Sequence, residues 1–318
     1  MHPPTPHRSS AKLPRVAVVG AGAMGSIFGA AFGDAGSDTV FIDDSAPLVE
    51  RLRERGLVIV DEDREREIEV SATTDPGPIG FVDLVLFLVK CYRTESAAKL
   101  ARPLVGPETI VASFQNGSGN GEVLARFFSA EQMVVGATYD SGTVLAPGRV
   151  AHTYKAETFI GPYVGESVDH ARWIADLLAA GGFRVTATPT VREAIWEKLV
   201  MTSATLPTAA LTGLTSGALG DHKPMLDLVD GIALEAVETA HAAGYELESA
   251  KQLDNIRLAL VGEGKASMLQ DVESGRQTEI DVINGAVLRE AEARQVDVPL
   301  NRAMVALIKG WERAHGLV

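Results

Sequence analysis

Residues 16–36, VAVVGAGAMGSIFGAAFGDAG, decide the fold, because a run of β-branched residues passes into a glycine-rich turn and then into an alanine-rich segment. Gly20, Gly22 and Gly25 have the G-x-G-x-x-G spacing, which becomes specific when it follows a strand and opens a helix. Gly20 permits the tight turn, Gly22 lets a pyrophosphate approach the backbone, and Gly25 lets the helix pack closely on the strand. The N-terminus of such a helix presents free N–H groups and a positive dipole end to phosphates. The stretch therefore predicts a dinucleotide-binding unit; the alternative is a glycine-rich turn that holds no ligand.

The cofactor contacts expected at this turn are Gly20, Gly22, Ala23, Met24 and Gly25. The next β-rich run, TVFIDD, ends in Asp43 and Asp44. A carboxylate at this position accepts hydrogen bonds from the ribose hydroxyls, and its charge repels a 2′-phosphate. We therefore expect Asp43 to bind the cofactor and NAD(H) to be preferred over NADP(H). The alternative is that both acids are solvated turn residues.

The first half of the chain alternates short runs rich in Val, Ile and Phe with helical segments. Runs that are apolar on both faces and separated by helices predict a parallel sheet covered by helices. Three later runs, at 148–154, 158–163 and 183–189, are expected to form the far edge of this sheet.

The pattern of apolar residues changes after Pro189: strand-like runs end there and helical periodicity begins. We expect a flexible tail over 1–13, an α/β Rossmann-type dinucleotide-binding domain over 14–190, and an all-α C-terminal domain over 191–318. The alternative is one continuous domain.

Composition narrows the classes of partner. With 46% hydrophobic residues the chain can bury a large core, while its formal net charge of −13 disfavours nucleic acid and anionic membrane surfaces. The one cysteine, Cys91, excludes an internal disulfide and is typical of a reducing cytoplasm. The longest apolar run, LVLFLV at 84–89, is too short to span a bilayer, and residues 1–12 do not have the pattern of a signal peptide. The seven histidines are scattered without ligand spacing, so no metal site is expected.

The chain resembles the ketopantoate reductase (2-dehydropantoate 2-reductase) family over about residues 15 to 312. The resemblance rests on GAGAMG at 20–25, LVLFLVKCYRT at 84–94, FQNG at 114–117, IWEKLV at 195–200 and, most specifically, SMLQDVESGRQTEIDVING at 267–285. It implies a Rossmann domain followed by an all-helical domain, with an active site between them. It also implies reduction of a 2-oxo acid with hydride from NAD(H) or NADP(H), and it leaves NADP(H) open.

The same resemblance assigns site residues. It implies that Lys90 and Asn116 lie near the cofactor, Asn116 also near the substrate, that Lys198 is catalytic, that Ser267 binds substrate, and that Glu279 is an acidic partner. Each has a plainer alternative: a strand-end charge, an Asn-Gly turn, a surface lysine, a helix N-cap, and an acid favoured by a helix dipole.

Hydride transfer explains why a lysine is needed. Negative charge develops on the carbonyl oxygen, so a cation or proton donor must lie beside it. Partial burial can lower a lysine pKa towards about 7–8, where it transfers protons efficiently, and Glu279 is expected to hold and orient Lys198. On a helical wheel Lys198 shares its side with Thr202 and Thr205, so we expect it to face small, hydroxylated neighbours.

The catalytic helix departs from the family pattern at two positions. Where ketopantoate reductases carry asparagines four and eight residues after the lysine, this chain has Thr202 and Leu206, both predicted to line the substrate site. Each missing hydrogen-bond partner costs about 1–3 kcal/mol. We therefore expect a different and more apolar 2-oxo acid, with ketopantoate retained as a candidate.

Two rival functions stay open on the sequence. A β-hydroxyacid dehydrogenase also has a catalytic lysine on a helical domain, but its asparagine four residues later is absent here. A catalytically silent NAD(H)-binding sensor would bind cofactor without turning over any 2-oxo acid. Apolar stripes at 231–244 and 283–295 suit a homodimer by resemblance, or packing within the helical domain.

Overall fold

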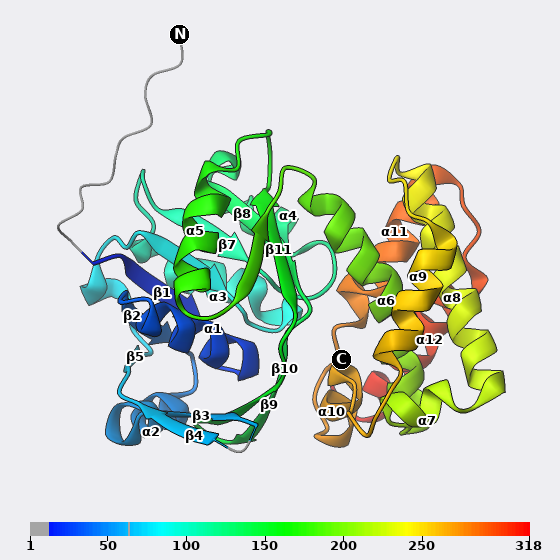
Figure 1. Cartoon of the computed structure of the whole chain (residues 1–318), viewed down its shortest axis with the longest axis horizontal. Coiled ribbons are helices and arrows are strands. Elements are labelled where there is room, and N and C mark those ends of the chain that lie inside the picture. The colour runs from blue at the N-terminus through cyan, green and yellow to red at the C-terminus, as the bar shows by residue number, and fades with distance from the viewer. Residues whose placement is uncertain (1–12, 63) are drawn as a thin grey trace, which may run out of the picture.

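The computed structural model describes residues 13–62 and 64–318, so the tail expected over 1–13 lies almost wholly outside the described residues. The chain folds into a sheet-containing part and a part made of helices (Figure 1). The fold class expected from the sequence is confirmed.

An eight-stranded sheet forms the centre of the first part, in the order β12-β11-β8-β7-β6-β1-β2-β5. Its strands are β1 (Arg15–Val19), β2 (Asp38–Ile42), β5 (Ser71–Thr73), β6 (Leu84–Phe87), β7 (Ile110–Ser113), β8 (Met133–Thr138), β11 (Glu157–Pro162) and β12 (Arg184–Ala187). Neighbouring strands are parallel except β8 and β11. The carboxyl ends of β1, β6, β7 and β8 therefore share one edge, where ligands bind in such sheets.

Helices cover both faces of this sheet. Alternate residues of β1 belong to different cores: Val16 and Val18 pack with α1 and α5, and Ala17 and Val19 pack with α3. This two-sided burial explains the continuous apolar runs of the sequence. The helices of this part are α1 (Ala23–Asp34), α2 (Ala46–Arg55), α3 (Thr94–Ala101), α4 (Asn120–Leu124) and α5 (Asp169–Ala180), with short 3₁₀ turns η1 (Gly77–Ile79), η2 (Cys91–Arg93), η3 (Arg102–Leu104) and η4 (Ala130–Gln132).

A second, four-stranded sheet corrects one expectation. Its order is β4-β3-β10-β9, formed by β3 (Leu57–Asp61), β4 (Arg64–Ile68), β9 (Ser141–Ala146) and β10 (Arg149–Tyr154). The run at 148–154 therefore leaves the main sheet, and only β11 and β12 form the far edge. The physical reason is that Leu57, Ile59 and Val150 bury their side chains in the core that also contains Phe28 of α1.

The second part contains α6 (Val191–Thr212), α7 (Ser216–Gly220), α8 (Lys223–Ala242), α9 (Ser249–Ala259), α10 (Ser267–Glu273), η5 (Ile280–Val282), α11 (Asn284–Arg294) and α12 (Pro299–Ala314). Helix α6 packs on α8 and α10 and also contacts β8 and β11, so it lies between the sheet and the other helices (Figure 1). No helix within the described part of the chain is long and apolar enough to cross a membrane.

Helix α6 contains a proline in its interior, Pro207. Proline has no N–H, so the carbonyl four residues earlier, that of Ser203, loses its helical partner. The side-chain amide of Asn284 donates to this carbonyl at 2.9 Å and to Asn301 Oδ1 at 3.0 Å. All four residues are buried. The freed carbonyl is thus satisfied, and α6 is joined by directional bonds to α11 and α12.

Candidate active site

In the turn between β1 and α1, Gly20 and Gly25 pack tightly against neighbouring atoms, whereas Gly22 borders open space. Gly20 has φ +100°, and a Cβ on Gly25 would lie 1.8 Å from the carbonyl oxygen of Gly20. A Cβ on Gly22, the N-cap of α1, would meet no atom within 4 Å. The space at Gly22 and the N–H groups of the first turn, which include those of Ala23 and Met24, fit a pyrophosphate.

Asp43 braces this turn from the end of β2. Its Oδ2 accepts from the backbone N–H of Ala21 at 2.9 Å, and its Oδ1 accepts from that of Ser45 at 3.0 Å. Asp44 is exposed and pairs with Arg93 at 3.0 Å. The carboxylate of Asp43 is therefore fixed beside the turn, whereas that of Asp44 lies on the surface.

Helix α6 brings Lys198 to the carboxyl ends of β7 and β8. The Nζ atom donates to Asn116 Oδ1 and to the carbonyl of Thr138, both at 2.6 Å, and lies 6.0 Å from the ring centroid of Tyr139. Burial lowers the pKa of Lys198 to about 8, while the charges of Glu279 and Asp140 act in the opposite direction. An ammonium group held by neutral oxygens at this pKa can give up its proton near neutral pH.

Lys90, just beyond the end of β6, has charged partners instead. Its Nζ lies 2.6 Å from Asp271 Oδ2 and 3.5 Å from Glu279 Oε2. Burial alone would lower the pKa of Lys90, but the charges of Glu279 and Asp271 outweigh it and raise the pKa above its usual value. Lys90 is therefore a fixed cation.

The position of Glu279 corrects the expectation that it holds Lys198. Its Oε1 accepts from the backbone N–H of Cys91 at 3.0 Å and its Oε2 faces Lys90, so it acts on Lys198 only through its charge. It also precedes η5 instead of lying on a helical face. The preceding residue, Thr278, donates its N–H and hydroxyl to buried Glu312, which fixes the backbone in this place.

Contrary to the expectation from the sequence, the hydroxyls of Thr202 and Thr205 on α6 do not project into the site. Thr202 donates to the carbonyl of Lys198 at 2.9 Å, and Thr205 donates to that of Met201 at 2.8 Å. Such back-bonding to the helix is the common use of a buried threonine hydroxyl. Leu206 packs at the margin of the helical core. The wall of α6 beside Lys198 therefore presents methyl groups more than donors.

Ser267 is the first residue of α10 and is half-buried. Ala266 is the N-cap of that helix, so the alternative of Ser267 as the cap is wrong. The hydroxyl is thus not required to begin the helix.

Several residues of the site had no clear signal in the sequence. They are Asp271, Thr138, Tyr139, Asp140 and His152. Asp271 is buried on α10 with Met268 and Leu269, and a buried acid indicates a cationic partner.

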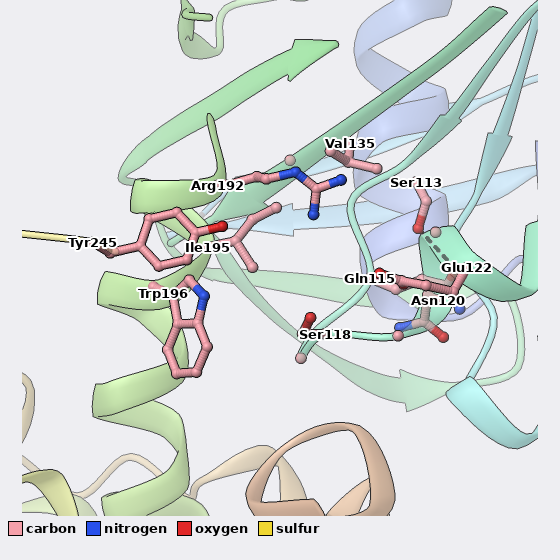
Figure 2. A pocket seen from close by; sticks show the side chains of 14 residues that line it. Ser113, Gln115, Ser118, Asn120, Glu122, Val135, Arg192, Ile195, Trp196 and Tyr245 are labelled. Carbon is pink, nitrogen blue, oxygen red and sulfur yellow. Dashed lines mark hydrogen bonds between the residues drawn. The ribbon is translucent and has the colours of Figure 1, made fainter. Parts of the chain in front are cut away.

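A small pocket lies between the end of β7 and the first turns of α6 (Figure 2). Ser113 and Gln115 line one side and Trp196 lines the other. The hydroxyl of Ser113 donates to Gln115 Oε1 at 2.8 Å (dashed in Figure 2), and Gln115 Nε2 donates to the carbonyl of Val89 and to Thr94 Oγ1. These amide and hydroxyl groups thus connect the segment that carries Lys90 to β7 and the segment after it, which carries Asn116.

Comparison with known proteins agrees with this geometry. The family "Ketopantoate reductase PanE/ApbA" matches residues 16–165, and "Ketopantoate reductase PanE/ApbA C terminal" matches residues 190–312. The 2-dehydropantoate 2-reductase of Archaeoglobus fulgidus is 30% identical over 95% of this chain and 99% of its own. That of Halobacterium salinarum is 32% identical over 94% of this chain and 99% of its own.

Solved structures show the same arrangement. A PanE/ApbA family ketopantoate reductase from Ralstonia eutropha has a TM-score of 0.86 and 29% identity, over 95% of this chain and 99% of its own. The ternary structure of D-mandelate dehydrogenase with NADH and anilino(oxo)acetate has a TM-score of 0.91 over 96% of this chain and all of its own. Its identity is 23%, so this second likeness concerns the fold.

Proposed function

The chain belongs to the ketopantoate reductase family and is an NAD(P)-dependent oxidoreductase, and from this premise we propose that it reduces a 2-oxo acid to the 2-hydroxy acid with Lys198 as general acid. One observation carries the assignment. Lys198 is the lysine that neutral oxygens hold at the strand ends, with a pKa lowered to about 8.

A nicotinamide cofactor held at the glycine turn around Gly22 would supply the hydride that reduces the carbonyl carbon of the substrate. Charge then develops on the carbonyl oxygen, and Lys198 Nζ donates a proton to it. Asn116 Oδ1 and the carbonyl of Thr138 direct the ammonium during this step. Lys90 stays protonated and holds Glu279 and Asp271 in place across the two parts of the chain.

The preferred substrate is a 2-oxo acid with an apolar side chain, with ketopantoate as the family's reference compound. Support comes from α6, where the hydroxyl of Thr202 is engaged by its own helix and Leu206 is apolar. D-mandelate dehydrogenase, which shares the fold, has a structure with anilino(oxo)acetate, so aryl-substituted 2-oxo acids are included among the compounds to be tested. Asn116, Thr202, Leu206 and Ser267 are proposed to line the substrate.

NADH is proposed as the preferred reductant. Asp43 lies at the end of β2 with its carboxylate fixed beside the glycine turn, whereas the charge of exposed Asp44 is paired with Arg93. The charge of Asp43 would repel a 2′-phosphate.

The test is the rate of NADH and NADPH oxidation with ketopantoate and with a panel of alkyl and aryl 2-oxo acids. We expect turnover with NADH and a higher kcat/KM for an apolar member of the panel than for ketopantoate. A preference for NADPH would contradict the assignment of Asp43. Binding of NADH without turnover of any 2-oxo acid would contradict the reductase and favour a sensor.

A further inference from the structure

Asp140 has a buried carboxylate, and it follows closely the residue whose carbonyl binds Lys198. Thr138, the last residue of β8, offers its carbonyl to Lys198, and Asp140 follows two residues later with a side chain only 3% exposed. Asp140 Oδ2 accepts from the hydroxyls of Thr138 and Thr158 at 3.2 and 3.3 Å. The mechanism above uses the Thr138 carbonyl but neither the Asp140 carboxylate nor the two hydroxyls.

His152 occupies the other oxygen of Asp140. Its Nε2 lies 2.8 Å from Asp140 Oδ1, and its side chain is 9% exposed. The ring stacks on Phe183 at 5.7 Å between centroids, and Phe183 stacks on Phe28 of α1 at 4.6 Å. Because a carboxylate only accepts, Nε2 must carry the hydrogen, a tautomer assigned from the network. The second sheet thus has a local consequence: β10 returns a histidine to the end of β8.

Two negative charges act on Lys198. One is that of Glu279, in the segment before η5, but Lys90 lies between the carboxylates of Glu279 and Asp271, and Arg276 also pairs with Asp271 at 3.1 Å, so two cations match these two carboxylates. The other is that of Asp140, two residues after the carbonyl that holds Lys198, where its partners are the hydroxyls and His152.

The remaining neighbours of Lys198 are uncharged. They are Asn116, the Thr138 carbonyl and the ring of Tyr139, and burial raises the pKa of that phenol, which keeps it neutral. Within the described part of the chain, Asp140 is therefore the counter-charge of Lys198 that no other lysine shares.

We propose that Asp140, held in place by a hydrogen bond from His152, is a positioning residue that keeps Lys198 protonated for the reaction. The inference rests on the proposed role of Lys198 as general acid and deepens it. Without the carboxylate, the desolvated ammonium would lose its proton at lower pH, and less of the enzyme would carry the acid form.

The test is a titration of Lys198 in the free protein, followed through its ¹³Cε resonance in lysine-labelled samples and assigned with Lys198→Arg. In Asp140→Asn, which keeps the shape, we expect the pKa of Lys198 to fall by about one unit. His152→Gln keeps an N–H donor and should leave the value near that of the wild type, whereas His152→Leu should lower it. Asp169→Asn, a matched change on exposed Asp169 of α5, should have no effect.

An unchanged Lys198 pKa in Asp140→Asn would overturn the proposal. Equal behaviour of His152→Gln and His152→Leu would overturn the part assigned to His152, and this pair carries the test if Asp140→Asn does not fold. The titration uses no substrate, so it stands apart from the proposed function, whose failure would appear as absent turnover by the wild type. Where turnover is present, the alkaline limb of kcat/KM for reduction should move down by the same interval.

Discussion

Two lysines of this molecule lie within the influence of one carboxylate, Glu279, and have opposite surroundings. Lys90 has two carboxylates within 3.5 Å and a raised pKa, while Lys198 is hydrogen-bonded to an amide oxygen and a backbone carbonyl and has a pKa near 8. The side chain is the same, and the charge of its nearest acceptors decides whether it is a permanent cation or a proton donor. A functional assignment based on the residue type alone would not separate the two.

The largest expected effect comes from removing each amine in turn. Lys198→Met should lower kcat for 2-oxo acid reduction by about 10² to 10⁴, the usual contribution of general acid catalysis. Lys90→Met should lower kcat far less and weaken cofactor or substrate binding instead. Steady-state kinetics on both variants, with circular dichroism to verify folding, measure this. Equal losses in kcat would end the distinction between the lysines.

The pH dependence of the wild type gives the next effect. Reduction requires Lys198 protonated, so kcat/KM should be level below pH 8 and fall about tenfold per unit above it. Lys90 has a raised pKa and stays charged across this range. Initial rates between pH 6 and 10 give the profile. A level profile up to pH 10 would contradict Lys198 as the acid.

Two matched variants test whether the protonation of Lys198 is coupled to the carboxylates around Lys90. Glu279→Gln removes a partner of Lys90 and also one of the charges that raise the pKa of Lys198. The alkaline limb of the kcat/KM profile of Glu279→Gln should therefore move to lower pH. At pH 8 the loss in kcat/KM should reach up to about tenfold. Asp271→Asn removes a partner of Lys90 and Arg276 that is not among the charges raising the pKa of Lys198, so it should leave the alkaline limb in place. A shift of the alkaline limb in both variants would show that the two lysines and their carboxylates titrate as one unit.

The smallest effect on rate is expected from the support of α6, which carries Lys198 but not Lys90. Asn284→Ala leaves the carbonyl of Ser203 buried without a donor, at about 1–3 kcal/mol of unfolding free energy, with only a few-fold change in kcat. Denaturant unfolding measures the cost, and Asn255→Ala on the exposed face of α9 is the control. Equal stability of the two variants would remove the structural role of Asn284.

The parts of the fold that follow from local patterns were predictable. The β-branched run and glycines of residues 16–36 specify their strand, turn and helix within about 20 residues of chain. The second sheet was missed because β4, REREI, alternates charges in an exposed position, and because β10 pairs with β3 from far along the sequence. No local period reports such a pairing.

The contacts among the candidate site residues were not predictable from residue spacing. Lys198 contacts Asn116, and Lys90 contacts Glu279 although the two are separated by 189 residues. Which lysine a carboxylate meets depends on the packing of α6 against β8 and on the anchoring of Thr278 by Glu312. These are tertiary contacts with no counterpart in residue spacing.

Pro207 and Asn284 have a consequence for how this sequence can change over time. Replacing Pro207 with alanine returns an N–H that competes with the Asn284 amide for the Ser203 carbonyl, and leaves that amide with Asn301 Oδ1 as its acceptor. Replacing Asn284 alone leaves the Ser203 carbonyl without a donor and also removes the bond to Asn301. Once Pro207 is alanine, losing Asn284 no longer strands the carbonyl, so the double replacement is expected to cost less than the sum of the single ones and the two positions to be epistatic.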